Sequence, residues 1–590
     1  MKRFISALCA LLLCVPALSA ASAEVADDLF TDKDLTLADP SGAVDIVLTE
    51  GGVDITEPGV YRLSGQIAGG SIRVAPATEG DVWLLLDGVS VHNESGAALT
   101  SDGCDKLILT LAEGSLNSLT QGSATPSAED NDAAIYVRDD LTINGTGALT
   151  IESAYLDGIN CRDSLRIVSG EITVNAVDDG LVGKDEVTVG GGTITIYAQT
   201  GDGIKSTNAE DADRGFVTIA GGTLTVSTGE GSASVSQTSS DGWGGWGGWE
   251  QQTEEDTPSQ KGVKAETTLT VSGGVLSIDS VDDALHAVDV AISGGEITLA
   301  TGDDGVHADN TLTVSGGTIT VTRSYEGLEG ADVTLSGGEI SVTASDDGIN
   351  GAGGDDATST GEGTFGASGR FGRDRFASST GAVHISGGII FVDASGDGVD
   401  VNGDLEMTGG ELYVNGPQSG GDGALDYDGS FTLTGGTLVA VGAAGMAQGV
   451  SDPAIPGTAM NASGSGTLEV LDSAGNALVH FESLRSYSHI VIYSDRFTDG
   501  ETYTLTMGAD SQSVQMTTDS TGGMGFGGGF GGGRGGFGGD RGDRGGTSKT
   551  PPEGIAPEEA PDAPPEGMPD APPEGTPPKG APDASGDEKL

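Results

Sequence analysis

The chain has 590 residues, of which 101 are glycine, and its 89 acidic against 26 basic side chains give a formal net charge of −63 at pH 7. So strong a negative field argues against nucleic acid and anionic membrane surfaces as partners, and it favours a cation-bound or neutral partner. The length alone would suggest several domains, but glycine and acid recur in phase, which favours a repeat array with tails.

The first 23 residues have the three parts of a secretory signal peptide. Lys2 and Arg3 give the positive start, Ile5 to Val15 the apolar centre, and Ala21-Ser22-Ala23 the cleavage site. The apolar run is short for a membrane span, and a buried N-terminal strand is the alternative interpretation. Residues 24–44 are interpreted as a linker. We therefore expect a secreted, extracellular protein, with association with the cell surface left open and no transmembrane segment.

Paired glycines recur through the middle of the chain. Gly170 to Gly192 is a step of 22 residues, and Gly274 to Gly295 is a step of 21. A period in this range is typical of solenoids. The second glycines of these turns are Gly170, Gly192, Gly222, Gly274, Gly295, Gly317, Gly338, Gly388, Gly410 and Gly436.

Each period contains two short strand patterns with tight corners, as in TLTVSGGTITV at 311–321. Pairing each strand with its equivalent one turn later satisfies the backbone groups. We therefore predict an all-β fold, a parallel β-helix over 45–460 with coils ~4.8 Å apart. Two insertions, at about 228–260 and 351–380, interrupt it.

The two ends of the repeat array differ from its middle. After about 450 the glycine corners stop, and residues 461–518 predict a β-rich C-terminal cap, which would cover the open sheet edge. Residues 519–590 are glycine-rich and then rich in proline and glutamate, which predicts a disordered tail. Cys104 and Cys161 fall about two coils apart, so we expect free structural thiols rather than a disulfide.

An aspartate precedes a glycine at the same point of most repeats. Stacked coils would place these carboxylates about 5 Å apart, and each neighbouring pair would repel by roughly 0.8 kcal/mol in water. Calcium, with six to eight oxygen ligands, would reverse that repulsion, and the following glycine would let the backbone turn its carbonyl inward. A solvated acidic edge is the alternative. The candidate calcium ligands are Asp157, Asp178, Asp179, Asp202, Asp282, Asp283, Asp303, Asp304, Asp346, Asp347, Asp397 and Asp422.

Other side chains near this corner vary between repeats. One repeat has Glu326 and another Lys261 in place of the aspartate. His286 and His307 follow the acids by three positions, and we interpret them as exposed corner residues rather than ligands. A second row of acids is expected a few residues on, formed by Asp163, Asp185, Asp289, Asp309, Asp332 and Asp404.

The insertions carry unusual side chains. Trp243, Trp246 and Trp249 are three of only four tryptophans in the chain. They are weak candidates for stacking on sugar rings, and an unstructured loop is an equal alternative. The second insertion contains Arg370, Arg373 and Arg375, a positive patch in an acidic molecule.

The segments ITEPGVYRLSGQIAGGSIRV at 55–74, VWLLLDGVSVHNESGAAL, LTLAEGSLNSL and the repeated DDGI/V…LTVSGGTITV resemble a secreted bacterial carbohydrate-binding family, over roughly 45–510. The resemblance implies a right-handed parallel β-helix similar in shape to pectate lyases. It also implies bound calcium and binding to plant-type polysaccharide, cellulose or polygalacturonate, without established catalysis. Lys261 and Glu326 depart from the DDG motif, which weakens the expectation of metal binding in their two coils.

Three functions remain open. The first is a monomeric, calcium-braced, non-catalytic carbohydrate-binding protein. The second is a calcium-dependent, pectate-type lyase, which needs a basic residue beside the metal; a glycosidase would need one distinct carboxylate pair, and none stands out. The third is a surface adhesin or matrix protein stiffened by calcium. Candidate lyase bases are Arg138, Arg162, Arg166, Lys184, Lys205 and Arg323.

Overall fold

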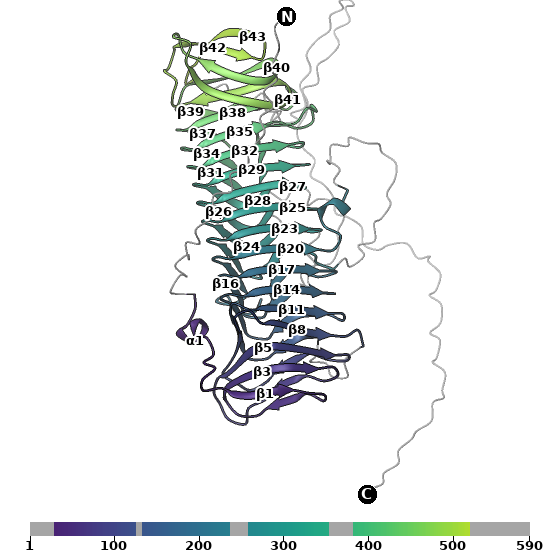
Figure 1. Ribbon diagram of the computed structural model, residues 1–590. Coiled ribbons are helices and arrows are strands. Elements are labelled where there is room, and N and C mark those ends of the chain that lie inside the picture. Colours follow the sequence, from purple (N-terminus) through teal and green to yellow (C-terminus); the bar gives the residue numbers. More distant parts are fainter. Residues whose placement is uncertain (1–28, 125–131, 237–257, 353–380, 520–590) are drawn as a thin grey trace, which may run out of the picture. The chain divides into compact units, whose positions relative to one another are not determined.

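The computed structural model describes residues 29–124, 132–236, 258–352 and 381–519, and these are almost entirely β-structure (Figure 1). The chain divides into two compact units, Met1–Gly527 and Gly528–Leu590. The second unit lies wholly outside the described residues, as do the predicted signal peptide, the three insertion tryptophans and almost all of the second insertion. The first unit is a parallel β-helix, which confirms the predicted fold class.

Each regular coil runs through three faces, and every strand pairs in parallel with its equivalent one coil later. Ile172 pairs with Ile194, for example, and Leu165 with Val187. The sequence predicted two strands per coil. The structure has three, because a short strand directly after the acidic corner forms a face of its own; in the coils that begin with β24, β26 and β28 this strand continues into the next one.

The strands fall into four groups. Face 1 contains β2 (Val53–Ile55), β4 (Ile72–Val74), β6 (Leu99–Ser101), β9 (Ala133–Val137), β12 (Asp157–Cys161), β15 (Leu181–Gly183), β18 (Ile204–Ser206), β21 (Val263–Lys264), β30 (Ile349–Gly351), β33 (Val399–Val401) and β36 (Asp426–Tyr427). Face 2 contains β1 (Val44–Leu48), β3 (Gly59–Ile67), β5 (Val82–Asn93), β7 (Lys106–Leu111), β10 (Asp140–Gly145), β13 (Ser164–Ile167), β16 (Glu186–Val189), β19 (Phe216–Ile219), β22 (Thr268–Val271), β31 (Ala382–Ile385), β34 (Asp404–Met407), β37 (Phe431–Leu433) and β39 (Asp452–Pro453). Faces 1 and 2 share β24 (Leu285–Ile292), β26 (Val306–Val314) and β28 (Leu328–Leu335). The long strands β3 and β5 continue from face 2 into face 3, where β5 pairs with β8. Face 3 contains β8 (Leu116–Gln121), β11 (Ala148–Ser153), β14 (Glu171–Ala176), β17 (Thr193–Ala198), β20 (Thr223–Thr228), β23 (Val275–Ser280), β25 (Glu296–Thr301), β27 (Thr318–Arg323), β29 (Glu339–Ala344), β32 (Ile389–Ala394), β35 (Glu411–Asn415) and β38 (Thr437–Gly442).

The core follows from the alternation of apolar and polar residues in these strands. In β17 the burial pattern alternates strictly, with Ile194 and Ile196 buried and Thr193 and Thr195 exposed. Equivalent residues of successive coils then stack inside, so isoleucine, valine and leucine form one continuous cluster through the β-helix. This stacking of like side chains is what a solenoid offers in place of a globular core.

The paired-glycine turns behave as the period predicted. Gly192 has φ of +92°, a left-handed conformation that L-residues adopt at a cost. A Cβ atom there would also lie 2.7 Å from the carbonyl oxygen of Gly170 in the preceding coil. Both the backbone conformation and the close approach of the coils therefore require glycine.

The C-terminal end of the β-helix is covered by an antiparallel cap. At the C-terminal end β40 (Gly457–Leu471), β41 (Ala477–Ser494), β42 (Thr502–Met507) and β43 (Asp510–Gln515) form antiparallel pairs, and β41 pairs with β38 of the last coil. The aromatic ring of Phe481 stacks on Tyr413 with 5.9 Å between ring centroids. Near the other end, the segment interpreted as a linker contains a short helix, α1 (Asp32–Leu35), that packs on face 2. A single 3₁₀ turn, η1 (Ser232–Ser234), opens the first insertion.

Two further expectations can be compared with this fold. Cys104 and Cys161 are both free and buried, as predicted, and burial raises the pKa of each thiol to about 12. Within the part of the chain that the structure describes, no helix is long and apolar enough to cross a membrane.

Candidate functional site

The acidic corner stacks along the β-helix. Backbone hydrogen bonds fix the register: the Gly158 amide donates to the Asp179 carbonyl, and the Gly180 amide donates to the Asp202 carbonyl. The same pattern continues through the described coils. We call this register position the acid row; it comprises Asp157, Asp179, Asp202, Lys261, Asp283, Asp304, Glu326, Asp347, Asp397 and Gly423.

Each aspartate of the acid row is tied to the next coil. The Oδ1 atom of Asp179 accepts a hydrogen bond from the Asp202 amide at 2.7 Å, and the Oδ1 atom of Asp347 accepts one from the Asp397 amide at 2.6 Å. Repulsion between stacked carboxylates is thus partly offset by charge-assisted hydrogen bonds to the backbone. One oxygen of each carboxylate has this structural role, which the sequence did not reveal, and the other is left for a second partner.

The glycine after each acid has a different role from the one expected. Gly180 does not have a left-handed backbone; instead, a Cβ atom there would lie 2.4 Å from Ile196 and 2.5 Å from the Gly203 carbonyl oxygen. The carbonyl of the preceding acid, Asp179, accepts the Gly158 amide of the neighbouring coil. Glycine is therefore needed for close packing between coils rather than for turning a carbonyl inward.

A second register position, three residues after the acid row, changes in charge along the β-helix. We call it the partner row. In order, it comprises Asn160, Val182, Lys205, Lys264, His286, His307, Glu329, Asn350, Asp400 and Asp426. The middle coils thus place bases beside the acid row, and the later coils place Glu329, Asp400 and Asp426 there, with Asn350 among them.

In the middle coils lysine ammonium groups lie among the acids. Lys205 Nζ is 3.2 Å from Asp179 and 3.3 Å from Asp202, and Lys261 Nζ contacts Asp282 and Asp283. Burial opposes the charge of Lys261, but Asp283 and Asp282 outweigh it and raise its pKa. Burial likewise opposes the charge of Asp283, but Lys261 outweighs it and lowers that pKa. These side chains are tethered cations.

The interpretation of His286 and His307 as exposed corner residues is wrong. Their exposed fractions are 6% and 1%, because the two rings stack on each other across adjacent coils with centroids 4.9 Å apart. His286 Nδ1 lies 2.9 Å from Asp283, and His307 Nδ1 lies 3.1 Å from Asp304 and 2.8 Å from Glu329.

In the later coils three carboxylates of the acid row and the partner row form a cluster. Carboxylate oxygens of Asp347, Asp397 and Asp400 lie within 4.8 Å of one another. Among the described residues, no lysine, arginine or histidine forms an ion pair with any of the three. Burial raises the pKa of Asp347 to about 9, that of Asp397 to about 8 and that of Asp400 to about 6. This cluster, which we call the acid trio, has the oxygen ligands that a hard divalent cation binds.

The other predicted ligands occupy different positions. Asp178, Asp282, Asp303 and Asp346 precede the acid row by one residue and are half-buried. Asp422 also precedes it, because the last coil places Gly423 at the row position, where its amide donates to Asp397 Oδ1 at 2.5 Å. At the opposite end of the row, burial and then Asp179 raise the pKa of Asp157 well above its ordinary value.

The predicted second row of acids does not exist as one row. Asp289, Asp332 and Asp404 share a register position, but Thr311 and Ala382 alternate with them. Asp163 and Asp185 pair one residue earlier in their coils, and Asp309 lies on an irregularity of β26. The spacing of the residues in the sequence does not show these register shifts.

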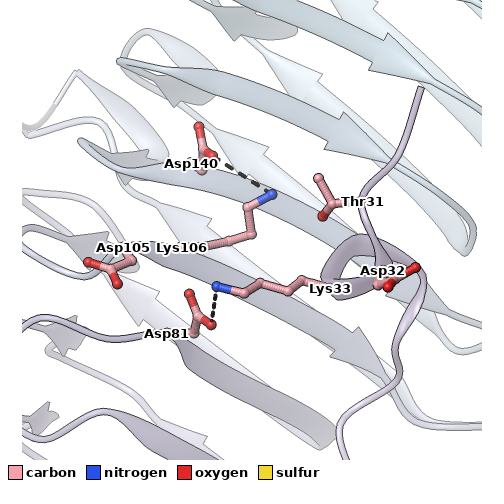
Figure 2. Close-up of a pocket in the computed structure, with 7 residues that line it drawn as sticks. All are labelled: Thr31, Asp32, Lys33, Asp81, Asp105, Lys106 and Asp140. Atoms are coloured by element: carbon pink, nitrogen blue, oxygen red, sulfur yellow. Dashed lines mark ion pairs between the residues drawn. The ribbon is translucent and has the colours of Figure 1, made fainter. Parts of the chain in front are cut away.

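A pocket of about 450 Å³ lies where α1 meets face 2 (Figure 2), and the sequence gave no indication of it. Its residues are Thr31, Asp32, Lys33, Asp81, Asp105, Lys106 and Asp140. Lys33 pairs with Asp81 at 2.6 Å and Lys106 with Asp140 at 3.7 Å, as the dashed lines of Figure 2 show. Lys106 also contacts the buried Asp34 of α1 at 2.7 Å, so these charges hold the N-terminal segment in place.

A family model described as "Carbohydrate-binding domain-containing protein" matches residues 49–305 and 303–473, more than half of the chain. A protein of that description from Acetivibrio thermocellus is 36% identical over 149 residues, which cover 25% of this chain and 51% of the relative. This chain therefore aligns with about half the length of that curated relative.

A solved structure, that of the polysaccharide lyase-like protein from C. thermocellum as a gadolinium derivative, is 26% identical. It covers 46% of this chain and 96% of its own, with a TM-score of 0.35. The family match spans the three-faced coils and the acid row from β2 to the start of the cap. The chain belongs to the family of carbohydrate-binding domain-containing proteins.

Proposed function

We propose that the protein is a secreted, non-catalytic, calcium-braced carbohydrate-binding protein that recognises plant-type polysaccharide, with polygalacturonate or cellulose as the ligand. Family membership supports the carbohydrate. The acid trio is the observation that carries the calcium: three clustered carboxylates with which no basic side chain of the described residues forms an ion pair. The signal-like first 23 residues support secretion.

Calcium fits the acid trio better than a proton or a smaller ion does. Asp347 and Asp397 each use Oδ1 for a backbone amide, which leaves their Oδ2 atoms and the Asp400 carboxylate for a cation. Calcium accepts six to eight oxygen ligands in flexible geometry, with water completing the shell, whereas magnesium requires a near-ideal octahedron. Asp346 and Asp426, which both raise carboxyl pKa values in the trio, add negative charge nearby.

The tethered cations argue against calcium in the middle coils. Lys205 already lies between the successive carboxylates Asp179 and Asp202, and Lys261 takes the place of a carboxylate in the row and contacts Asp282 and Asp283. A bound calcium there would have to displace a buried ammonium group. Of the twelve aspartates that the sequence predicts as calcium ligands, we therefore assign those of the later coils, Asp347 and Asp397, as the primary calcium ligands.

Face 3 offers a surface for the polysaccharide. Its outward central position carries a hydroxyl in each successive coil, which we call the hydroxyl row: Ser118, Thr150, Thr173, Thr195, Thr225, Ser277, Thr298, Thr320 and Ser341. These side chains are exposed or half-exposed, and the register spaces them regularly at ~4.8 Å. Two aromatic residues, Phe391 and Tyr413, continue the row and pack under the cap.

Calcium also accounts for how so acidic a protein could hold an acidic sugar. A cation bound by protein carboxylates that keeps coordination positions for water can exchange that water for a uronate carboxylate. The formal net charge of −63 would otherwise repel polygalacturonate.

The lyase alternative requires a base near the metal, and Lys205 is the candidate beside the acid row. Burial opposes its charge, but Asp202 and Asp179 outweigh it and raise its pKa, so this ammonium group holds its proton. A base must release its proton near the working pH. The Lys205 side chain is therefore better suited to a structural role than to that of a catalytic base.

The experiment is retention of the purified protein on polygalacturonate, cellulose and xylan, with calcium and with chelator, while absorbance near 235 nm is followed for unsaturated products. We expect calcium-dependent retention and no rise in absorbance. A steady rise on polygalacturonate would establish a lyase instead, and no retention on any glycan would leave a calcium-stiffened structural protein.

A further inference from the structure

Strand β26 has one extra residue relative to its neighbour β24, and this residue creates a bulge beside the two stacked histidines. Ala287 pairs with Ala308, but the next pair is Asp289 with Thr311, so residues 309–310 of β26 lie opposite residue 288 alone. The same shift recurs against β28. Bulges commonly re-aim a side chain toward a functional site. Here the bulge carries Asp309.

The bulge aims Asp309 at the second nitrogen of both rings. Its Oδ1 atom lies 3.4 Å from His307 Nε2 and 4.0 Å from His286 Nε2. The Asp309 side chain is 44% exposed, whereas the histidine side chains are 1% and 7% exposed. Two buried nitrogen atoms thus converge on one carboxylate that opens to solvent.

Carboxylates on the opposite side hold the Nδ1 atoms. Asp283 faces His286 Nδ1 at 2.9 Å, and Asp304 faces His307 Nδ1 at 3.1 Å. A histidine that binds a metal through Nε2 almost always donates its Nδ1 proton to such a partner, which orients the ring and makes the nitrogen a better ligand. Both histidines have this arrangement, and both acids belong to the acid row.

We propose that His286, His307 and Asp309 form a binding site for a divalent transition-metal ion of the zinc class, separate from the calcium of the acid trio. Nitrogen and oxygen ligands about 2.0–2.1 Å from a tetrahedral zinc ion stand roughly 3.4 Å apart. The distance from Asp309 Oδ1 to His307 Nε2 matches this value, and the 4.0 Å from Asp309 Oδ1 to His286 Nε2 would have to shorten on binding. Imidazole suits zinc, cobalt, nickel and copper, whereas calcium takes oxygen ligands. The exposed side of Asp309 provides the entry path and a position for water.

The competing account needs no metal. Protonated histidines would act as tethered cations, like Lys261, for Asp283, Asp304 and Glu329. Both accounts use the same contacts, so binding of the metal decides between them.

The test titrates Co²⁺ into full-length protein without a polyhistidine tag, treated with chelator and then saturated with calcium to fill the oxygen sites. We expect one equivalent of Co²⁺ to give visible absorption bands of a nitrogen-ligated ion, and Zn²⁺ to abolish them. A wild-type protein that shows no such bands overturns the proposal.

Variants locate the site. Asp309→Ala removes an exposed ligand and leaves the fold intact, so it stays informative where His286→Ala unfolds; we expect it to weaken Co²⁺ binding by roughly tenfold or more. Two control variants should bind as the wild type does: His384→Ala, at a half-exposed histidine beside Glu406, and Asp347→Asn, in the acid trio. Equal binding by Asp309→Ala and the wild type would also overturn the proposal.

Discussion

Two stretches of the same corner use opposite means of managing stacked negative charge. From Asp202 to Asp304 the coils carry Lys205, Lys261, His286 and His307 among the acids. From Asp347 onward the equivalent positions carry no basic residue: they are Asn350, Asp400 and Asp426. The backbone hydrogen bonds between successive corners follow the same pattern in both. The comparison teaches that two register positions, the partner row and the acid row at Lys261, determine whether a coil contains its own cation or depends on one from solution.

The largest effect should follow removal of a tethered cation. Lys261→Met leaves Asp282 and Asp283 without the ammonium group that contacts both, and losing one member of a buried ion pair costs about 3–5 kcal/mol of unfolding free energy. Denaturant unfolding in chelator measures it.

The matched control is Lys264→Met, which removes a partly exposed lysine 4.0 Å from Glu266 and should change stability by less than about 1 kcal/mol. Because Asp282, Asp283 and Asp303 are clustered, the Lys261→Met protein should also gain stability from calcium. Equal stability of the two variants would contradict the division into two regions.

In the acid trio a neutralising substitution should change stability in the opposite direction: without calcium it should stabilise the protein. Asp397→Asn keeps an oxygen for the Gly423 amide but removes a carboxyl group that, on folding, must either take up a proton or stay charged where it is buried, so in chelator it should stabilise the protein by on the order of 1 kcal/mol. In calcium it should destabilise, because a ligand is lost. Thermal melts in the two buffers give both signs, and a loss of stability in chelator would count against the assignment.

The pH dependence of the unfolding free energy should also distinguish the coils of the acid trio from the coils that carry tethered cations. Burial raises the pKa of Asp347 from its ordinary 3.8 to about 9, so the folded state binds this proton more tightly than the unfolded state does. In chelator its contribution to stability is therefore fully present below about pH 4 and is lost as the pH rises through about 9.

The measurement is the difference in unfolding free energy between the wild type and Asp347→Asn across this range, which removes contributions from other groups. Calcium should flatten the difference by favouring the charged form. A difference that is already independent of pH in chelator would show that Asp347 is not held protonated.

The smallest effect on stability is expected on face 3, where the two regions do not differ. Replacing Thr195 and Thr225 with alanine removes exposed hydroxyls and should change the unfolding free energy by no more than about 0.5 kcal/mol. Retention on the bound polysaccharide should nevertheless fall. Unchanged retention would remove the hydroxyl row from the proposed binding surface.

Much of the fold could be predicted because a solenoid repeats its local rules. The period of the paired glycines gave the coil length, and Gly192 shows why: both its conformation and its neighbour exclude a side chain. The partner row was also visible in principle, as the residue three places after each acid. Only His286 and His307 were singled out at this position from the sequence, and the prediction that their side chains are exposed was wrong.

Other features of the site arise from shifts in strand register that the amino-acid sequence does not show. The bulge at Asp309 and the displacement of Asp422 depend on how one coil packs on the next. The docking of α1 depends on the buried contact between Asp34 and Lys106, which are 72 residues apart. Such contacts need the three-dimensional structure.

The most direct test of the central claim is a crystal structure of the protein with calcium, with the ion located by its anomalous scattering. We predict calcium at Asp347, Asp397 and Asp400, and none between Asp202 and Asp283, where Lys261 lies. Calcium in the lysine-bearing coils, or an acid trio without calcium, would contradict the account.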